Sequence, residues 1–392
     1  MPSEGTPGVY GARAARAYAA MQARFHTRGG QYRRDGIHLP GTSAHVWPLA
    51  RAMVATLDLA GVEQGAVREV IGDFDAEAEI ADRLNALERY YDASGEPPAY
   101  SSDVAGTRIG GDRYYDDNAW VGLALVQLER MRPGAGRLDR AEEVFRFALG
   151  GWDRRPDVPS PGGVFWLEQG RGAGLKNHDR NTVSTAPNAE IGLHLAELGV
   201  AVEAPGSIGV EDMYEWVVAT LDAGGGVGAG AGASAGSAGE APGTGLFWDK
   251  IRGDDTIDRA LWSYNQGSMV GLNVLLARRS GQAGAAYLYR AEAIARKALR
   301  HYAGGGLEGQ PPSFNAIFFR NLLLLHAATG DDVLRATIMA AMRGYADWAW
   351  AEKRDRRDRF PISNQDKLLD QSAMVQILAL LAWDPEAYSL LA

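Results

Sequence analysis

Apolar residues recur at helical spacing along almost the whole chain, and the strict alternation typical of strands is nearly absent. The segments 137–149 and 285–302 carry apolar residues on one face and charges on the other, which predicts helices with one solvated side. By contrast, the segments 116–131, 313–329 and 368–383 are apolar nearly all round. That pattern predicts helices that are buried on every side.

The complete pattern predicts twelve helices in which half-solvated and fully buried members alternate. Their expected ranges are 8–25, 43–60, 77–91, 116–131, 137–149, 182–198, 210–222, 261–279, 285–302, 313–329, 331–352 and 368–383. Loops that follow half-solvated helices are mostly long, whereas those that follow buried helices are mostly short. Six helical hairpins of this kind describe an all-α (α/α)6 barrel. Because the long loops all fall where the inner helices begin, we expect the functional site at that end.

Residues 223–245 consist largely of Gly and Ala and cannot contribute to a core. The helical pattern resumes after them, so we predict a flexible loop at the functional end rather than a linker between domains. The whole chain, residues 1–392, is therefore expected to form a single (α/α)6 domain.

Composition and charge narrow the classes of ligand. The net charge of −9 argues against nucleic acid or an anionic membrane as the main partner. No stretch approaches the roughly 18 apolar residues that a membrane span needs. The chain has no cysteine, which excludes disulfides and thiolate chemistry, and no His and carboxylate cluster has metal-ligand spacing. We therefore expect neither a metal nor another cofactor.

The strongest chemical signal is the segment YYDDNAW at 114–120, in which Asp116 and Asp117 precede a buried helix after a long loop. Aspartate is also a preferred residue at the N-terminus of a helix, where free amides and the helix dipole stabilise it. Two adjacent carboxylates are costly to place together, however, and in a cleft one of them tends to hold its proton. An acid beside an ionised carboxylate is the arrangement that glycoside hydrolysis needs.

A second signal is WSYNQG at 262–267, which also opens a buried helix. The amides of Asn265 and Gln266 both donate and accept hydrogen bonds, as sugar hydroxyls require, and Trp262 and Tyr264 can stack on a sugar ring. Helix capping by Ser263 or Asn265 is the alternative interpretation. Similar residues stand near other inner helices: Tyr115, Asn181, Ser184, Trp248, Asp249, Gln310 and Phe314.

Together these segments resemble glycoside hydrolase family 76, the α-1,6-mannanase family. The resemblance rests on 114–120, GGVFW at 162–166, the segment 181–184, WSYNQG at 262–267 and the stretch 314–320, and it runs over roughly residues 10–385.

The resemblance implies a retaining hydrolase without a cofactor, in which the first aspartate of the pair, Asp116, is the nucleophile and the second, Asp117, is the general acid and base. It implies an α-1,6-linked mannan or manno-oligosaccharide as the substrate. Tyr264, Asn265 and Gln266 would hold sugar hydroxyls, with Trp262 or Trp248 as stacking platforms.

Three alternatives stay open on the sequence alone. An α-1,6-glucan could replace mannan, and another sugar could replace water as the acceptor, which would make the protein a transglycosylase. Sugar epimerases and isomerases on the same scaffold use histidine pairs, but the seven histidines of this chain form no obvious pair. We expect a monomer that is cytoplasmic if this N-terminus is native, because no signal peptide is visible, and secreted if a leader has been removed.

Overall fold

The computed structural model of the chain describes residues 7–35, 42–72, 74–106, 111–169, 177–202, 208–224, 245–363 and 365–392. Its α-helices in these ranges are α1 (Pro7–Phe25), α2 (Val46–Ala60), α3 (Gln64–Ile71), α4 (Ala76–Glu88), α5 (Tyr115–Met131), α6 (Leu138–Gly150), α7 (Thr182–Glu197), α8 (Val210–Leu221), α9 (Ser263–Arg279), α10 (Gly284–His301), α11 (Pro312–Ala328), α12 (Asp332–Trp348) and α13 (Leu368–Leu380). Short 3-10 turns are η1 (Gly281–Ala283), η2 (Gly306–Gly309) and η4 (Pro385–Leu390), and η3 (Ala349–Lys353) is a π turn.

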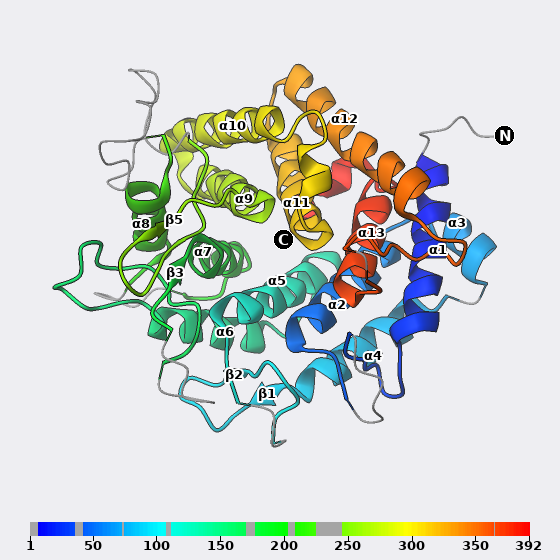
Figure 1. Cartoon of the computed structure of the whole chain (residues 1–392), viewed down its shortest axis with the longest axis horizontal. Coiled ribbons are helices and arrows are strands. Elements are labelled where there is room, and N and C mark those ends of the chain that lie inside the picture. The colour runs from blue at the N-terminus through cyan, green and yellow to red at the C-terminus, as the bar shows by residue number, and fades with distance from the viewer. Residues whose placement is uncertain are drawn as a thin grey trace.

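The helices form two concentric rings (Figure 1). The inner ring consists of α2, α5, α7, α9, α11 and α13, each packed against the next, with α13 closing against α2. The outer ring consists of α1, α4, α6, α8, α10 and α12. Inner and outer helices alternate along the chain, so the all-α (α/α)6 barrel predicted from the sequence is confirmed.

Burial follows the apolar pattern of each helix. In α13 every residue but Leu369 is buried, because a helix of the inner ring meets neighbours on all sides. In α10 the side chains that face its neighbour α9 are buried, while Tyr289 on the other side is 62% exposed. Close packing within the inner ring depends on small residues as well: a Cβ at Gly267 of α9 would lie 2.7 Å from the Cα of Phe318 in α11.

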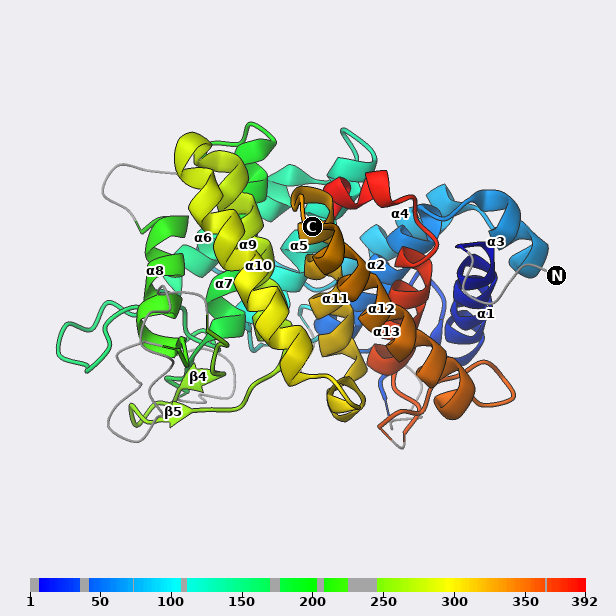
Figure 2. The same ribbon diagram turned by 90° about the horizontal axis from the view of Figure 1, so that it is seen from above.

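The long loops after outer helices contain short antiparallel strands. These strands are β1 (Tyr91–Asp92), β2 (Ala99–Tyr100), β3 (Arg180–Asn181), β4 (Lys250–Ile251) and β5 (Ile257–Asp258). One sheet has the order β3-β4-β5, with Arg180 opposite Ile251 and Lys250 opposite Asp258, and β1 pairs with β2 in a separate hairpin. The strands β4 and β5 lie at the end of the barrel where the inner helices begin, which we call the loop end (Figure 2).

Several boundaries differ from the sequence prediction. The helix predicted from residue 43 begins at Val46, because Ser43 pairs with Arg33 in an extended bridge. The helix predicted to reach residue 91 ends at Glu88, because Tyr91 belongs to β1. The short α3 was not predicted, since only Val67 of its residues is buried and it has little apolar pattern.

The Gly- and Ala-rich segment 223–245 lies mostly outside the described residues, which stop at Gly224 and resume at Gly245. Its two ends meet, because the backbone N–H of Ala223 donates to the carbonyl of Leu246 at 2.8 Å. The segment therefore leaves and rejoins the fold at neighbouring points. None of the helices in the described ranges is both long and apolar enough to cross a lipid bilayer.

Candidate active site

The aspartate pair stands in the first turn of α5, at the loop end. Tyr114 precedes the helix in an extended conformation, and the N–H of Tyr115 donates to the carbonyl of Trp166 at 3.0 Å. This bond fixes where α5 begins and leaves Asp116 and Asp117 in its first turn, where backbone amides lack helical partners. Both aspartates are half-buried, so they sit in a partly desolvated place while remaining accessible from outside.

Both carboxylate oxygens of Asp116 accept a hydrogen bond. Its Oδ1 accepts from the backbone N–H of Asp117 at 3.0 Å, and its Oδ2 accepts from the indole N–H of Trp166 at 3.0 Å. Burial raises the pKa of Asp116 to about 6, with a further contribution from the negative charge of Asp249, and the two hydrogen bonds oppose the increase. Hydrogen bonds to a carboxylate favour its ionised form.

Asp117 has a different environment. Burial raises the pKa of Asp117 well above its ordinary value, and the charge of Asp116 raises it further. Two hydrogen bonds stabilise the carboxylate of Asp116, whereas no described residue donates one to Asp117, so Asp117 retains its proton more readily than Asp116 does. Two adjacent carboxyl groups with separated pKa values supply an acid and a carboxylate at one place.

Asp249, just before β4, is a third carboxyl group near the pair. It is 8% exposed, and burial raises its pKa. The Nδ2 of Asn265 donates to its Oδ1 at 3.3 Å, and the hydroxyl of Tyr264 also hydrogen-bonds with it. Burial and the negative charge of Asp249 raise the pKa of Tyr264 well above its ordinary value, so this hydroxyl is protonated and donates. The structure thus brings Asp249, Tyr264 and Asn265 together near Asp116.

Aromatic rings gather at the starts of α9 and α11. The ring of Tyr264 stacks on that of Phe314 with centroids 3.8 Å apart and planes at 4°. Trp262 approaches Phe314 edge-on at 5.7 Å, and Trp47 at the start of α2 lies 6.4 Å from the same ring. Trp47, Trp262 and Phe314 are half-buried, so each residue keeps part of its surface accessible at the loop end.

Four sequence-predicted residues have protein partners that account for their side chains. Gln266 accepts from the N–H of Phe247 at 2.8 Å and donates to its carbonyl at 2.9 Å, and the Oε1 of Gln310 accepts from the N–H of Ser263 at 3.0 Å. Tyr115 is buried and stacks on Phe147, and Trp248 is buried beneath the guanidinium of Arg259. These side chains fix loops and helix starts, and their roles in substrate binding stay predictions.

Three further predicted residues present polar atoms that lack a protein partner in the described part of the chain. They are Asn181 through Oδ1, Ser184 through Oγ and Asn265 through Oδ1. Asn181 and Ser184 stand at the start of α7, and Asn265 at the start of its neighbour α9. A buried polar atom without a partner is costly, so such atoms mark places where additional hydrogen bonds are favourable.

Trp166 has no predicted role, although it closes the GGVFW segment that carries part of the family resemblance. Trp47 has no predicted role either, because no recognisable motif surrounds it. Among the histidines that the structure describes, His45 lies beside Asp103, His178 lies beside the ring of Phe165, and Nδ1 of His194 accepts from Arg130 at 2.8 Å. Within the described ranges, no three His, Asp or Glu side chains are arranged to hold a metal ion.

No family model matches the sequence, and no curated protein matches it. Solved structures do match. A family 76 glycoside hydrolase (mannosidase) from Bacteroides thetaiotaomicron is 21% identical with a TM-score of 0.72 over 95% of this chain and 98% of that chain. The α-1,6-mannanase from a Salegentibacter species is 20% identical with a TM-score of 0.67 over 96% of this chain and 99% of that chain.

A D-mannose isomerase is also similar, at 12% identity with a TM-score of 0.61 over 96% of this chain and 99% of that chain. An inactive variant of the Salegentibacter mannanase, with two adjacent aspartates replaced by asparagine, forms a complex with α-1,6-mannotriose. At these identities the likeness concerns the fold. The chain has the (α/α)6 barrel of family 76 glycoside hydrolases, and the resemblance seen in the sequence is confirmed at that level.

Proposed function

We propose that the chain is a retaining glycoside hydrolase of the family 76 type that cleaves α-1,6-linked mannan or manno-oligosaccharides. Asp116 is the nucleophile and Asp117 is the general acid and base. The observation that carries the proposal is the adjacent, half-buried pair at the start of α5, in which the Asp116 carboxylate accepts hydrogen bonds from the backbone N–H of Asp117 and from the Trp166 indole. We also propose that residues 1–392 act as one catalytic domain.

Adjacency alone does not identify this pair as the catalytic one, because adjacent aspartates also occur at 254–255 and 331–332. Those two pairs stand in surface segments, where Asp254 and Asp332 are exposed. The pair formed by Asp116 and Asp117 opens an inner helix at the loop end and is partly desolvated. Desolvation is what separates the acid from the carboxylate, so we assign the chemistry to this pair.

In the proposed first step, Asp117 donates its proton to the glycosidic oxygen while a carboxylate oxygen of Asp116 attacks the anomeric carbon. The bond between that carbon and the leaving oxygen breaks, and a glycosyl ester with Asp116 forms. In the second step, the Asp117 carboxylate takes a proton from water, and the water oxygen attacks the anomeric carbon. The ester breaks, which restores ionised Asp116 and protonated Asp117.

We propose that the sugar at the point of cleavage lies between the aspartate pair and the start of α9. The half-buried ring of Trp262 and the stacked pair of Tyr264 and Phe314 give apolar faces suited to a sugar ring. Asp249 and the free Oδ1 of Asn265 supply acceptors for sugar hydroxyls.

The choice of mannan is supported by the solved structures with the same fold, which include an α-1,6-mannanase from Salegentibacter and its inactive variant. The inactive Salegentibacter variant, which lacks two adjacent aspartates and is seen with α-1,6-mannotriose, supports the assignment of the pair. An α-1,6-glucan is the alternative substrate, since the same backbone linkage joins its sugars.

Incubation of the protein with α-1,6-mannan and, separately, α-1,6-glucan tests the proposal through the release of oligosaccharides. The chain offers a matched control: Asp116→Asn removes the proposed nucleophile, whereas Asp332→Asn changes an exposed aspartate of another adjacent pair. We expect release from mannan by the wild type and Asp332→Asn, and a loss of about 10⁴-fold or more in Asp116→Asn. If Asp116→Asn releases oligosaccharides at a rate near that of the wild type, the assignment of the nucleophile is refuted. If the wild type releases oligosaccharides from glucan alone, glucan and not mannan is the substrate.

A further inference from the structure

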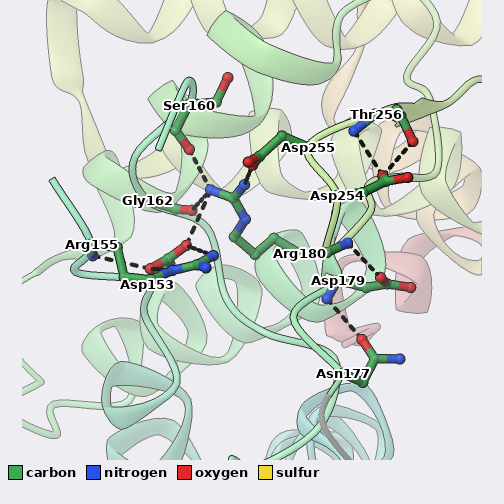
Figure 3. Close-up of polar contacts among 11 residues, drawn as sticks. Asp153, Arg155, Ser160, Gly162, Asn177, Asp179, Arg180, Asp254, Asp255 and Thr256 are labelled. Carbon is green, nitrogen blue, oxygen red and sulfur yellow. Dashed lines mark hydrogen bonds and ion pairs between the residues drawn. The ribbon is translucent and has the colours of Figure 1, made fainter. Parts of the chain in front are cut away.

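Arg180, the first residue of β3, is a fully buried arginine among the loops of the loop end (Figure 3). Its guanidinium lies 3.2 Å from Oδ2 of Asp153 and donates to Oδ1 of Asp255 at 2.9 Å. It also donates to the carbonyl of Gly162 at 3.2 Å and to that of Ser160. One side chain therefore joins the loop after α6 to the turn between β4 and β5.

The charges around Arg180 are arranged to keep it ionised. Burial lowers the pKa of Arg180, while the charges of Asp153 and Asp255 oppose this. Burial alone would raise the pKa of Asp153, but hydrogen bonds from Arg155 and the charge of Arg180 outweigh it and lower the pKa. A planar guanidinium presents several N–H donors in a fixed geometry, so it can hold carboxylates and carbonyls from different segments at once.

The backbone next to Arg180 leads directly to the aspartate pair. Arg180 pairs with Phe165 in an extended bridge, and the N–H of Trp166 donates to the carbonyl of Asp179 at 2.9 Å. The carbonyl of Trp166 accepts from Tyr115 at 3.0 Å, and its indole donates to Asp116. The position of the Trp166 indole is thus set by a segment that Arg180 fastens at two carbonyls, those of Ser160 and Gly162.

Arg180 also lies next to the contacts that hold Asp249, the third carboxyl group of the site. Arg180 is opposite Ile251 in the sheet, and the residue before it, Asp179, forms an ion pair with Lys250 at 2.8 Å. The carbonyl of Asp249 accepts from the N–H of Thr182, just after β3, at 2.9 Å. Asp249 is therefore held against β3 on one side while its carboxylate contacts Asn265 on the other.

We propose that Arg180 is a positioning residue for the reaction: by fastening these loops to β3, it holds the Trp166 indole against Asp116 and Asp249 against the start of α9. The inference rests on the proposed function of Asp116 and extends it to a residue that contacts neither the pair nor the sugar. A merely structural arginine would stabilise the fold without affecting how Asp116 ionises.

The ionisation of Asp116 is the readout that separates these two roles. The groups that face Asp116 are Asp117 and Tyr114 at the start of α5, Asp249 before β4, Tyr264 of α9 and the indole of Trp166. Among them only Trp166 donates a side-chain hydrogen bond to its carboxylate in the described part of the chain. Losing that bond should raise the pKa of Asp116 by about one unit, as expected for one hydrogen bond to a charged group.

The experiment compares Arg180→Met, Trp166→Phe and the double variant with the wild type. Arg83→Met serves as the control, because Arg83 is an equally buried arginine of the outer helix α4, bonded to Gly30 and Glu79. The acid limb of the pH profile of kcat/KM is measured on α-1,6-mannotriose. Carbon-13 NMR of labelled aspartate, with the Asp116 signal identified by its loss in Asp116→Asn, gives the same pKa without requiring activity.

We expect both single variants to move the acid limb and the NMR titration of Asp116 upward, and the double variant to move them little further. The Trp166 hydrogen bond, which both variants lose, affects the pKa of Asp116 more than the charge of Asp249 does. Arg83→Met should lower the melting temperature and leave the titration of Asp116 unchanged. Where Arg180→Met does not fold, Asp255→Asn removes one partner of the guanidinium and should give a smaller shift of the same sign.

An unshifted titration in a folded Arg180 or Asp255 variant would overturn the proposal, as would additive shifts in the double variant or an equal shift in Arg83→Met. If the wild type releases no sugar but the NMR shifts occur as expected, the positioning role stands and the proposed hydrolase function fails. The two roles are therefore separable by experiment.

Discussion

The indole N–H of Trp166 donates to Oδ2 of Asp116 at 3.0 Å and so connects the loop after α6 with the first turn of α5. This contact favours the ionised form of Asp116, because it stabilises the carboxylate and not the acid. Asp117 is half-buried beside the charge of Asp116, and both the burial and this charge raise its pKa. In the proposed mechanism, the loop therefore helps to decide which of the two neighbouring aspartates attacks and which one donates a proton.

Asp117→Ala should separate the two steps of the proposed reaction. Natural glycans have a poor leaving group that needs a proton, so their hydrolysis should fall by about 10²- to 10⁴-fold, the usual contribution of a general acid. An aryl glycoside with an acidic phenol needs little protonation, so its first step should survive and appear as a burst of phenol. Stopped-flow absorbance measures the burst. Equal losses of rate on both substrates would contradict this assignment and would favour the reverse one, in which Asp117 is the nucleophile and Asp116 the acid.

The pH profile of kcat/KM should be bell-shaped. The rate should fall as the pH drops through about 6, because burial raises the pKa of Asp116 to that value and the protonated nucleophile cannot attack. It should also fall on the alkaline side, as Asp117 loses the proton that burial and the Asp116 charge retain. With an aryl glycoside, Asp117→Ala should keep the acid limb and lose the alkaline limb. An alkaline limb that persists in this variant would belong to another group.

The architecture could be predicted because the apolar pattern of each helix indicates which of its faces are buried. The apolar surface of 368–383 and the one-sided pattern of 137–149 identify an inner and an outer helix without any knowledge of their partners. The aspartate pair was also visible, because its position before a buried helix is local information. Strands of two residues, such as β3 and β4, are too short for alternation to appear.

The contacts that support the pair could not be predicted, because they join residues far apart in sequence. Asp116 and Trp166 are 50 positions apart, and Arg180 and Asp255 are 75 positions apart, so neither contact leaves a periodic signal. An arginine in a loop is ordinarily exposed, so nothing in the sequence marked Arg180 as buried. Likewise, the Gln266 amide appeared suited to binding sugar hydroxyls, and only the fold reveals that it hydrogen-bonds with the backbone of Phe247.

Glu190 of α7 should make stability depend on pH. It is 2% exposed, its Oε1 has no partner among the described residues, and burial raises its pKa well above the ordinary value. Since the folded pKa exceeds the unfolded value of about 4.3, its stabilising contribution is complete below that pH and is lost as the pH rises towards the folded pKa. Glu190→Gln should match the wild type near pH 4 and melt at least roughly 2 °C higher near pH 8.

Thermal unfolding followed by circular dichroism checks this expectation. Glu386→Gln provides the control, because Glu386 is exposed and its substitution should give no such pH-dependent difference. A Glu190→Gln variant that melts below the wild type at pH 8 would show that ionised Glu190 is stabilising, which is the opposite of the expected sign.

Residues 225–244 should be dispensable for folding. The N–H of Ala223 donates to the carbonyl of Leu246, and the N–H of Trp248 donates to the carbonyl of Leu221, so the flanks already pair as a hairpin. A two-residue Gly-Ser link can close such a hairpin, and a shorter loop costs less closure entropy. The melting temperature, measured by calorimetry, should change by less than about 2 °C. A drop of about 5 °C or more would show that the removed residues pack against the fold.

The stereochemistry of the product tests most directly whether Asp116 forms a covalent bond with the sugar. Retaining enzymes hold their carboxyl groups roughly 5–5.5 Å apart, whereas inverting enzymes leave roughly 6.5–9.5 Å for a water, and adjacent aspartates suit the shorter gap. Proton NMR during hydrolysis of an α-1,6-linked manno-oligosaccharide distinguishes the two outcomes. We predict that the α-anomer of the new reducing end appears first and the β-anomer only later, by mutarotation. A β-anomer that appears first would contradict the double-displacement mechanism and exclude Asp116 as the nucleophile.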